Sequence, residues 1–185
     1  MYARINHYIC GETPLIVAID VELTLQIMRK QPIVALIYDF DGTLSPGNMQ
    51  EFGFIQAVGK SPKEFWQESD DIAAGQDASN VLSYMKLMFD EARNSGIKLR
   101  REDFKRFGES VELFQGVSEW FRLINEYGKE KGVKIEHYIN SSGLAEMIEG
   151  TSIAKEFKRI FACTFIYNEK GEAVWPGVAV DYTAK

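Results

Sequence analysis

The hydrophobic pattern is most distinctive over residues 33–38, where six apolar or aromatic residues follow one another without a polar interruption. The run is rich in β-branched residues and is bounded by Pro32 and Gly42, which predicts a strand buried on both faces. Two acidic residues, Asp39 and Asp41, follow it directly. Their spacing of two places both carboxylates on one side of an extended chain, at the end where open α/β sheets bind ligands.

Residues 46–114 carry hydrophobic positions at helical spacing. Ser61, Pro62 and Glu64 predict a helix start with a capping box. A second helix is expected to end at residues 94–96, and its apolar stripe consists of Val81, Met85, Met88 and Ala92, widened by Leu82 and Phe89. Such stripes favour core packing over ligand contact, so we expect a block of packed helices.

From residue 115 onward, helical and strand patterns alternate. Residues 117–131 predict an amphipathic helix, residues 133–140 a second strand, and Ser141-Ser142-Gly143 the opening of a further helix. The remaining expected elements are a short helix over 151–159, a third strand over 160–166, a tight turn at 168–171, and a paired strand over 173–180 with Pro176 at an edge or bulge. This order predicts an α/β fold with a parallel sheet.

Composition and charge narrow the function classes. The chain has 185 residues, of which 45% are hydrophobic and 26% charged, which is typical of one globular domain or of a core with a small insert. A formal net charge of −6, without a Lys/Arg-rich run, argues against nucleic-acid binding.

The cysteines and the amino-terminal segment indicate where in the cell the protein is expected. Cys10 and Cys163 are too few and too far apart for a disulfide framework, which fits a reducing compartment. The apolar stretch over residues 14–25 is interrupted by Asp20 and Glu22, so we expect no membrane span there. No signal-peptide pattern is present, and the cytoplasm is the expected location.

The sequence Asp39-Phe-Asp41-Gly42-Thr43-Leu44 resembles the first motif of the haloacid dehalogenase-like (HAD) superfamily of aspartate-nucleophile phosphohydrolases. Ser141-Ser142-Gly143-Leu144, which follows a glycine, a helix and a strand, resembles the second motif in its usual order. The resemblance implies a HAD-like Rossmannoid parallel sheet with an inserted α-helical cap. It also implies a core of residues 32–45 and 115–185, a cap over 46–114, and an amino-terminal extension of unclear role over 1–31.

The resemblance also implies roles for individual residues. Asp39 would be the nucleophile and a ligand of Mg²⁺, and Asp41 the general acid and base, with its backbone carbonyl on the metal. Gly42 would permit the turn and Thr43 would orient the loop, both near the phosphate. Because dehalogenases lack a second acid at the position of Asp41, phosphate chemistry is favoured.

Ser141 has two interpretations. Backbone N–H groups at a helix start bind anions and a serine hydroxyl adds a donor, but a serine at this position can also simply cap the helix. The resemblance favours phosphate binding by Ser141, with support from Ser142 and Gly143. It further implies a lysine beside the phosphate, for which Lys185 is the candidate.

One part of the family pattern is missing. Residues 142–185 contain no Gly-Asp pair that could complete the metal site, so the chain resembles a carboxyl-terminally incomplete HAD domain with weakened metal binding. Two functions are therefore expected. The first is a Mg²⁺-dependent phosphohydrolase that acts on a small phosphorylated metabolite through an aspartyl-phosphate, weak or inactive in this chain. The second is a non-catalytic remnant that associates with another copy or chain through an uncovered sheet edge.

Overall fold

The structure, a computed structural model, describes residues 31–181. The chain divides into two units, residues 1–32 and residues 33–185, and all of the elements described below belong to the second. The predicted extension over residues 1–31, apart from its last residue, and the candidate Lys185 lie outside the described residues.

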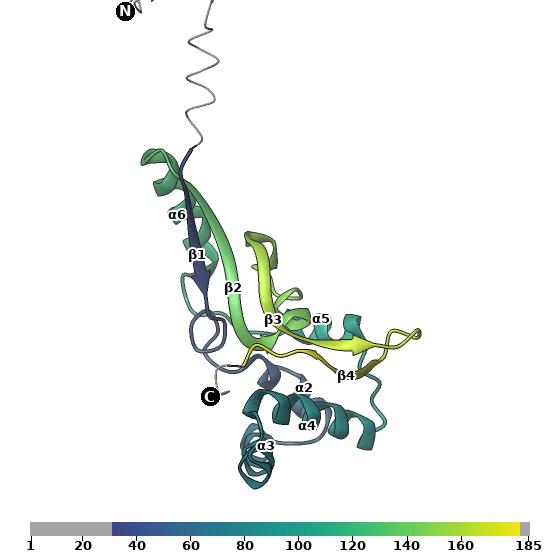
Figure 1. Ribbon diagram of the computed structural model, residues 1–185. Helices are drawn as coiled ribbons and strands as arrows, with labels where there is room; N and C mark the ends of the chain where they lie inside the picture. Colours follow the sequence, from purple (N-terminus) through teal and green to yellow (C-terminus); the bar gives the residue numbers. More distant parts are fainter. Residues whose placement is uncertain (1–30, 182–185) are drawn as a thin grey trace, which may run out of the picture. The chain divides into compact units, whose positions relative to one another are not determined.

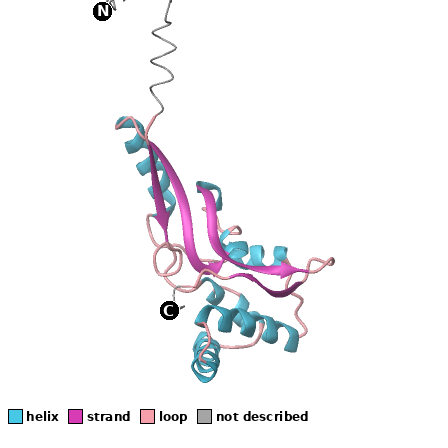
Figure 2. Ribbon diagram, in the orientation of Figure 1, coloured by secondary structure: helices cyan, strands magenta, loops and turns pink. Residues whose placement is uncertain are grey.

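A four-stranded sheet with the order β1-β2-β3-β4 forms the centre of the second unit (Figures 1 and 2). Its strands are β1 Ile33–Tyr38, β2 Lys134–Leu144, β3 Phe157–Tyr167 and β4 Ala173–Val178. The first three strands run parallel, and β4 pairs antiparallel to β3 after a turn closed by the N–H of Gly171 and the carbonyl of Asn168. The prediction of an α/β fold with a mostly parallel sheet is confirmed, and Pro176 lies on the edge strand as expected.

The helices occupy the connections between these strands. They are η1 Met49–Glu51, α2 Phe54–Ala57, α3 Pro62–Gln76, α4 Asn80–Asn94, α5 Arg101–Glu109, α6 Val117–Glu130, α7 Ala145–Ile148 and η2 Ala154–Glu156. The predicted start of α3 is confirmed, because Ser61 accepts the N–H of Glu64 while the Glu64 carboxylate accepts the N–H of Ser61. No helix in residues 31–181 is both long enough and apolar enough to span a membrane.

The prediction that β1 is buried on both faces is wrong. Ile33 is 58% exposed and Ile37 is 66% exposed, because β1 is an edge strand whose only neighbour among the described residues is β2. Apolar strand composition alone cannot distinguish a central strand from an edge strand, since both pack on at least one side. The acidic pair therefore follows an edge strand.

Helix α6 packs against β2 and lies beside β1 (Figure 1), and its Phe121 also contacts the first residue of β3. Phe121, which is almost fully buried, makes edge-to-face ring contacts with Tyr38, His137 and Phe157 at centroid distances of 5.9, 5.0 and 5.5 Å. The Tyr38 hydroxyl lies 2.9 Å from Nδ1 of His137 and accepts a hydrogen bond from Nε1 of Trp120. These contacts fasten Tyr38, which ends β1 directly before Asp39, and His137 of β2 to α6.

The structure differs from the sequence prediction at the end of β2. Residues 141–144 still belong to β2, and the helix that follows, α7, has four residues. The prediction that Ser141-Ser142-Gly143 opens a helix is therefore wrong, and no helix start supplies anion-binding N–H groups there. The third strand also begins earlier than predicted, at Phe157, so the expected helix over 151–159 is reduced to η2.

The helices between β1 and α6 are packed against the rest of this unit. Helices α3 and α4 pack on each other, α4 contacts β4, and α5 contacts α7. The interior of the block is built from aromatic residues, with Phe54 edge-to-face against Phe65 and Phe107 at 6.2 and 6.0 Å. The assignment of residues 46–114 to a separate cap domain stays a prediction.

Glu136 forms a charged cluster on β2. Its carboxylate accepts hydrogen bonds from Lys158 Nζ, Lys134 Nζ and the Tyr138 hydroxyl at 2.7, 2.9 and 2.7 Å. These hydrogen bonds, that from Lys158 foremost, lower the pKa of Glu136 from 4.5 to about 2.

We expect Glu136→Gln to lower the free energy of unfolding near neutral pH. We also expect the free energy of unfolding to fall less in acid for this variant than for the wild type. A depressed folded-state pKa stabilises the fold above the unfolded value of 4.5, and this contribution disappears as the pH falls through about 2. The measurement is urea unfolding between pH 2 and 7, with Glu130→Gln, an exposed residue of α6, as the control. Identical pH profiles for wild type and Glu136→Gln would contradict this expectation.

Candidate active site

The turn after β1 determines the positions of Asp39 and Asp41. Phe40 is completely buried between the two acids, and its carbonyl accepts N–H groups from Leu44 and Ser45 at 2.8 and 3.1 Å. Gly42 has a φ of 74°, a left-handed conformation that favours glycine, and its N–H donates to the carbonyl of Ser45. The buried Phe40 and this tight loop hold the backbone of both acids in place.

The two carboxylates have different surroundings. Asp39 is exposed, and its Oδ1 accepts the N–H of Phe40 at 2.7 Å. Asp41 is partly buried, and its Oδ1 accepts the N–H of Met49 at 2.9 Å. Burial raises the pKa of Asp41 to about 7, with smaller upward contributions from the charges of Asp39 and Glu51, against the lowering effect of the Met49 N–H. A carboxyl group at this position can act as a general acid or base.

The two sequence motifs meet at Gly143. A Cβ on Gly143 would lie 2.9 Å from Sδ of Met49 and 3.1 Å from Oδ2 of Asp41, so only glycine leaves room for both side chains. Met49 Sδ also accepts the N–H of Leu144 at 3.2 Å. The structure therefore brings Asp41 beside the Ser141-Ser142-Gly143 segment, although about a hundred residues separate them in the chain.

Ser141 and Ser142 both take part in hydrogen bonds within the protein. The Ser141 side chain is buried, and its hydroxyl oxygen accepts the N–H of Gly143 at 3.0 Å. The carbonyl of Ser142 accepts hydrogen bonds from the Tyr84 hydroxyl at 2.6 Å and from Sγ of Cys163 at 3.2 Å. Ser141 does not cap a helix, because it lies within β2 and the N-cap of α7 is Leu144. The phosphate-binding roles of Ser141, Ser142 and Gly143 stay predictions. Thr43 is exposed, with its N–H directed to the carbonyl of Phe40.

The acidic pair fits the ligand chemistry of Mg²⁺. This ion takes one or two carboxylates and completes its octahedron with water and substrate phosphate, so it does not need a closed cluster of protein ligands. None of the ion pairs formed by residues 31–181 involves Asp39 or Asp41, which leaves their mutual repulsion uncompensated within that part of the chain. The same residues contain no group of three or more His, Cys, Asp or Glu side chains arranged for a metal.

A cavity of about 230 Å³ opens beside Asp41, between the first loop and helices α3 and α4. Its lining is mostly polar and consists of Asp41, Asn48, Gln50, Trp66, Ser69, Asp70, Asn80, Val81, Tyr84 and Ser142. Residues from the acidic loop, from the helical block and from the end of β2 therefore share one wall.

Sequence reasoning missed Gln50 and Tyr84 in this wall. Tyr84 falls on the same helical stripe as Val81 and Met88, and a phenol on an apolar stripe signals a buried hydroxyl that needs a partner. Gln50 gave no comparable signal, because nothing in the sequence shows that it is buried.

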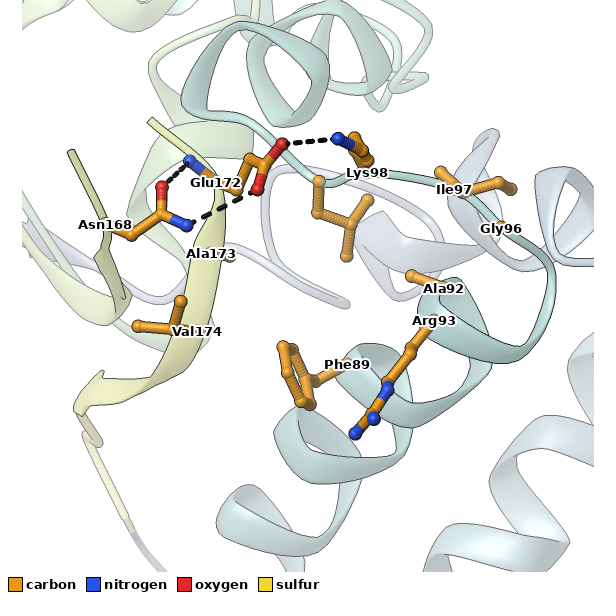
Figure 3. Close-up of a pocket in the computed structure, with 11 residues that line it drawn as sticks. Phe89, Ala92, Arg93, Gly96, Ile97, Lys98, Asn168, Glu172, Ala173 and Val174 are labelled. Carbon is orange, nitrogen blue, oxygen red and sulfur yellow. Dashed lines mark hydrogen bonds and ion pairs between the residues drawn. The ribbon is translucent and has the colours of Figure 1, made fainter. Parts of the chain in front are cut away.

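A larger hollow of about 350 Å³ lies between the end of α4, the loop before α5 and the β3–β4 hairpin (Figure 3). In Figure 3 the Glu172 carboxylate is held by Lys98 at 2.9 Å and by Nδ2 of Asn168 at 3.3 Å, whereas no interaction is drawn to the Arg93 guanidinium. Its lining shares no residue with the cavity at Asp41. It therefore lacks the acidic groups that make the first cavity a candidate active site.

Comparison of the sequence with known proteins gives one curated relative. It is an uncharacterized protein of Borreliella burgdorferi, 32% identical over 148 residues, which cover 75% of this chain and 52% of the relative. The chain thus spans about half the length of the curated relative that it matches. No family model matches the sequence.

Comparison with solved structures identifies the fold. A phosphoserine phosphohydrolase-like protein of Francisella tularensis has a TM-score of 0.52 at 23% identity, with 80% of this chain and 64% of that chain covered. A HAD family hydrolase of Salmonella enterica has a TM-score of 0.51 at 16% identity, with 83% and 50% covered. A substrate-bound phosphoserine phosphatase has a TM-score of 0.51 at 15% identity, with 79% and 61% covered. Together with the order of strands and motifs, these likenesses show that this chain has the α/β fold of HAD-like phosphatases.

Proposed function

We propose that a protein containing this chain is a Mg²⁺-dependent phosphohydrolase that acts on a small phosphorylated metabolite through an aspartyl-phosphate. The observation that carries the proposal is the position of Asp41, whose Oδ2 lies beside the Gly143 segment, on the same loop as the exposed carboxylate of Asp39. An exposed carboxylate and a second, more buried carboxyl group on one loop can supply a nucleophile and a general acid. The HAD-like fold supports hydrolase chemistry, and the substrate and the mechanism belong to the proposal.

The proposed hydrolysis has two steps. In the first, a carboxylate oxygen of Asp39 attacks phosphorus, the bond from phosphorus to the ester oxygen breaks, and the departing alkoxide takes the proton of Asp41. In the second, water attacks the aspartyl-phosphate, the Asp41 carboxylate takes a proton from that water, and inorganic phosphate leaves. Asp41 ends each cycle protonated and Asp39 ends it as a carboxylate.

The remaining assignments accompany this proposal. The Asp39 carboxylate and the backbone carbonyl of Asp41 would hold Mg²⁺, which neutralises charge on the phosphoryl group when bound. Ser141 would donate to a phosphoryl oxygen, and Lys185 is proposed to balance the charge of the nucleophile and the phosphate. The cytoplasm is the proposed location, supported by the low cysteine content.

The test is hydrolysis of 4-nitrophenyl phosphate by protein expressed from the complete reading frame that contains these residues. Release of 4-nitrophenol that depends on Mg²⁺ and is lost in Asp39→Asn supports the proposal. Hydrolysis that is absent from the wild type, or that persists in the variant, overturns it.

A second candidate function is self-association, and the exposed edge of β1 favours it. Strand β1 contains no Lys or Pro of the kind that protects natural edge strands. Val34 lies on the same face of β1 as Tyr38, which accepts the Nε1–H of Trp120 on α6, whereas Ile33 and Ile37 project from the opposite face. The apolar strip around this edge consists of Ile33, Val34, Ile37, Trp120, Leu123 and Tyr127, each between 41% and 66% exposed.

A second copy of the chain is the partner that we propose for this strip. Two β1 strands related by a two-fold axis would pair antiparallel, so that the free backbone N–H and C=O groups of one edge would hydrogen-bond with those of the other. Six large side chains at roughly half exposure present on the order of 500 Å² per copy, and two copies bury about 1,000 Å², the lower bound for a specific interface.

We expect the 185-residue chain to be a dimer in light scattering after size exclusion, and Ile37→Lys to make it a monomer. A lysine at position 37 of the edge would bury a charge without a partner in the paired strands. Ile166→Lys, at a similarly exposed position of β3, should leave the dimer intact. A monomeric wild type, or dissociation caused equally by both substitutions, would rule out pairing through β1.

A further inference from the structure

Residues 141–143 of β2 leave the regular ladder of the sheet. The ladder pairs on either side of them are Asn140–Phe161 and Leu144–Cys163. Between these two pairs β2 contains three residues and β3 contains only one, so residues 141–143 form a bulge, which we call the β2 bulge. Bulges of this kind leave backbone groups without a partner on the neighbouring strand, and proteins often place them next to active sites. Other parts of the chain therefore have to hold the backbone of the β2 bulge.

The carbonyl of Ser142, in the middle of the β2 bulge, is held by two side-chain donors. The Tyr84 hydroxyl donates to it at 2.6 Å, near the short end of the range for O–H···O hydrogen bonds, and the Cys163 thiol donates to it at 3.2 Å. Burial raises the pKa of Tyr84 and that of Cys163, so both groups keep their protons and remain donors. Tyr84 is the stronger of the two, because a thiol is a weak donor.

The β2 bulge also contacts the acidic loop. A Cβ on Gly143 would lie 3.1 Å from Oδ2 of Asp41, so the backbone of the bulge faces that carboxyl group directly. Met49 connects the same two segments, because its N–H donates to Asp41 Oδ1 and its Sδ accepts the N–H of Leu144. A displacement of the bulge would therefore change the distance between Asp41 and the Ser141 hydroxyl, which is the candidate donor to phosphate.

Tyr84 reaches the β2 bulge from the helical block. It lies on α4, is almost fully buried, and its ring meets that of Trp66 on α3 edge-to-face at 5.9 Å. Tyr84, Ser142 and Asp41 line the same cavity. The Tyr84 hydroxyl is thus a direct link between the helices that follow the acidic loop and the strand segment that faces Asp41.

We propose that Tyr84 is a positioning residue of the candidate active site, whose hydroxyl fixes the Ser142 carbonyl and thereby the position of the β2 bulge relative to Asp41. The inference rests on the proposed phosphohydrolase function and adds to it a residue of the helical block. Tyr84 acts through Ser142, and it contacts neither the phosphorus nor the nucleophile. Since a small misplacement of groups around a reacting centre slows the reaction more than it weakens binding, removal of the hydroxyl should lower kcat and leave KM nearly unchanged.

The experiment measures hydrolysis of 4-nitrophenyl phosphate by protein from the complete reading frame, as wild type and as Tyr84→Phe. We expect the variant to lower kcat about tenfold or more and to change KM by less than about threefold. The ring remains in place and Cys163 still donates to the Ser142 carbonyl, so the melting temperature should fall by only about 2–4 °C.

Tyr138→Phe is the matched control. Tyr138 also lies on β2, and its hydroxyl donates to Oε2 of Glu136 at 2.7 Å, but it does not line the cavity. Loss of this hydroxyl removes a tyrosine hydrogen bond of the same kind at a distance from the β2 bulge. It should lower the melting temperature by a similar amount and leave kcat unchanged.

The second donor allows a double-mutant cycle on the Ser142 carbonyl. Cys163→Ala should lower kcat less than Tyr84→Phe does, because the thiol is the weaker donor. The double variant leaves the carbonyl without a donor in the described part of the chain, so its loss of kcat should exceed the product of the two single losses. A loss equal to that product would overturn the assignment of the Ser142 carbonyl as the group through which Tyr84 acts.

The outcomes separate this inference from the proposed function. A kcat of Tyr84→Phe within about twofold of the wild type, a rise in KM alone, or an equal loss of kcat in Tyr138→Phe overturns the positioning role and leaves the phosphatase function standing. A Tyr84→Phe protein that is unfolded at the assay temperature also overturns that role, because the hydroxyl would then support the whole fold. Absence of hydrolysis by the wild type overturns the function, and with it the inference.

Discussion

Asp39→Asn is expected to reduce phosphatase activity by on the order of 10⁴-fold or more, because an amide oxygen cannot form the aspartyl-phosphate. The fold should be unaffected, since Asp39 is exposed and its contact with the Phe40 N–H uses an oxygen that asparagine also provides. The measurement is kcat for 4-nitrophenyl phosphate at saturating Mg²⁺, with the melting temperature recorded for the same preparation.

A carboxylate elsewhere on the surface supplies the control for this substitution. Asp90 lies on α4, forms an ion pair with Lys86 and is absent from the cavity lining. Asp90→Asn should retain wild-type activity, with at most a few tenths of a kcal/mol of lost stability. Residual activity of Asp39→Asn within tenfold of the wild type would show that the nucleophile lies elsewhere, whatever the geometry of the acidic loop.

Local sequence was sufficient to predict the structural features that depend only on neighbouring residues. The capping box at Ser61 and Glu64, the turn at Gly42 and the end of α4 all follow from residues within one helical turn, and the structure has each of them. The juxtaposition of Asp41 with Gly143 could be predicted only through family resemblance, since no periodicity links positions so far apart in the chain.

Long-range packing accounts for the predictions that were wrong. Ile37 is exposed because no strand pairs with the outer edge of β1 among the described residues. The composition of β1 alone does not show whether such a strand is present. Residues 141–143 lie in an irregularity between the Asn140–Phe161 and Leu144–Cys163 pairs of β2 and β3, and this long-range pairing overrides a serine-glycine pattern typical of a helix start. On α4, Leu82 was assigned to the buried stripe and is 45% exposed, because α3 and β4 contact a narrower face of that helix.

Two glycines between α5 and α7 show the same dependence on distant contacts. A Cβ on Gly108 would lie 2.9 Å from the carbonyl carbon of Met147, and one on Gly150 would lie 2.7 Å from that of Lys105. Real Cβ atoms do not approach backbone this closely, so the helix backbone and the chain after α7 are in direct contact. In the sequence both residues look like ordinary glycines in helix-like surroundings.

We expect Gly108→Ala and Gly150→Ala each to destabilise the fold by about 3 kcal/mol or more, because two backbone segments would have to separate. For a domain of this size, such a loss lowers the melting temperature by roughly 6–12 °C. The measurement is thermal and urea unfolding of each variant, followed by circular dichroism.

Gly75→Ala is the matched control, and it should act in the opposite direction. Gly75 lies inside α3, and a Cβ there would have no described atom outside its own helix within 4 Å, so alanine should stabilise that helix by about 0.5–1 kcal/mol through its better helix propensity. If Gly108→Ala were as stable as the wild type, the close contact between α5 and α7 would be absent in solution. Since α7 directly follows the Ser141-Ser142-Gly143 segment, loss of that contact would also remove the support that this packing gives to one wall of the candidate active site.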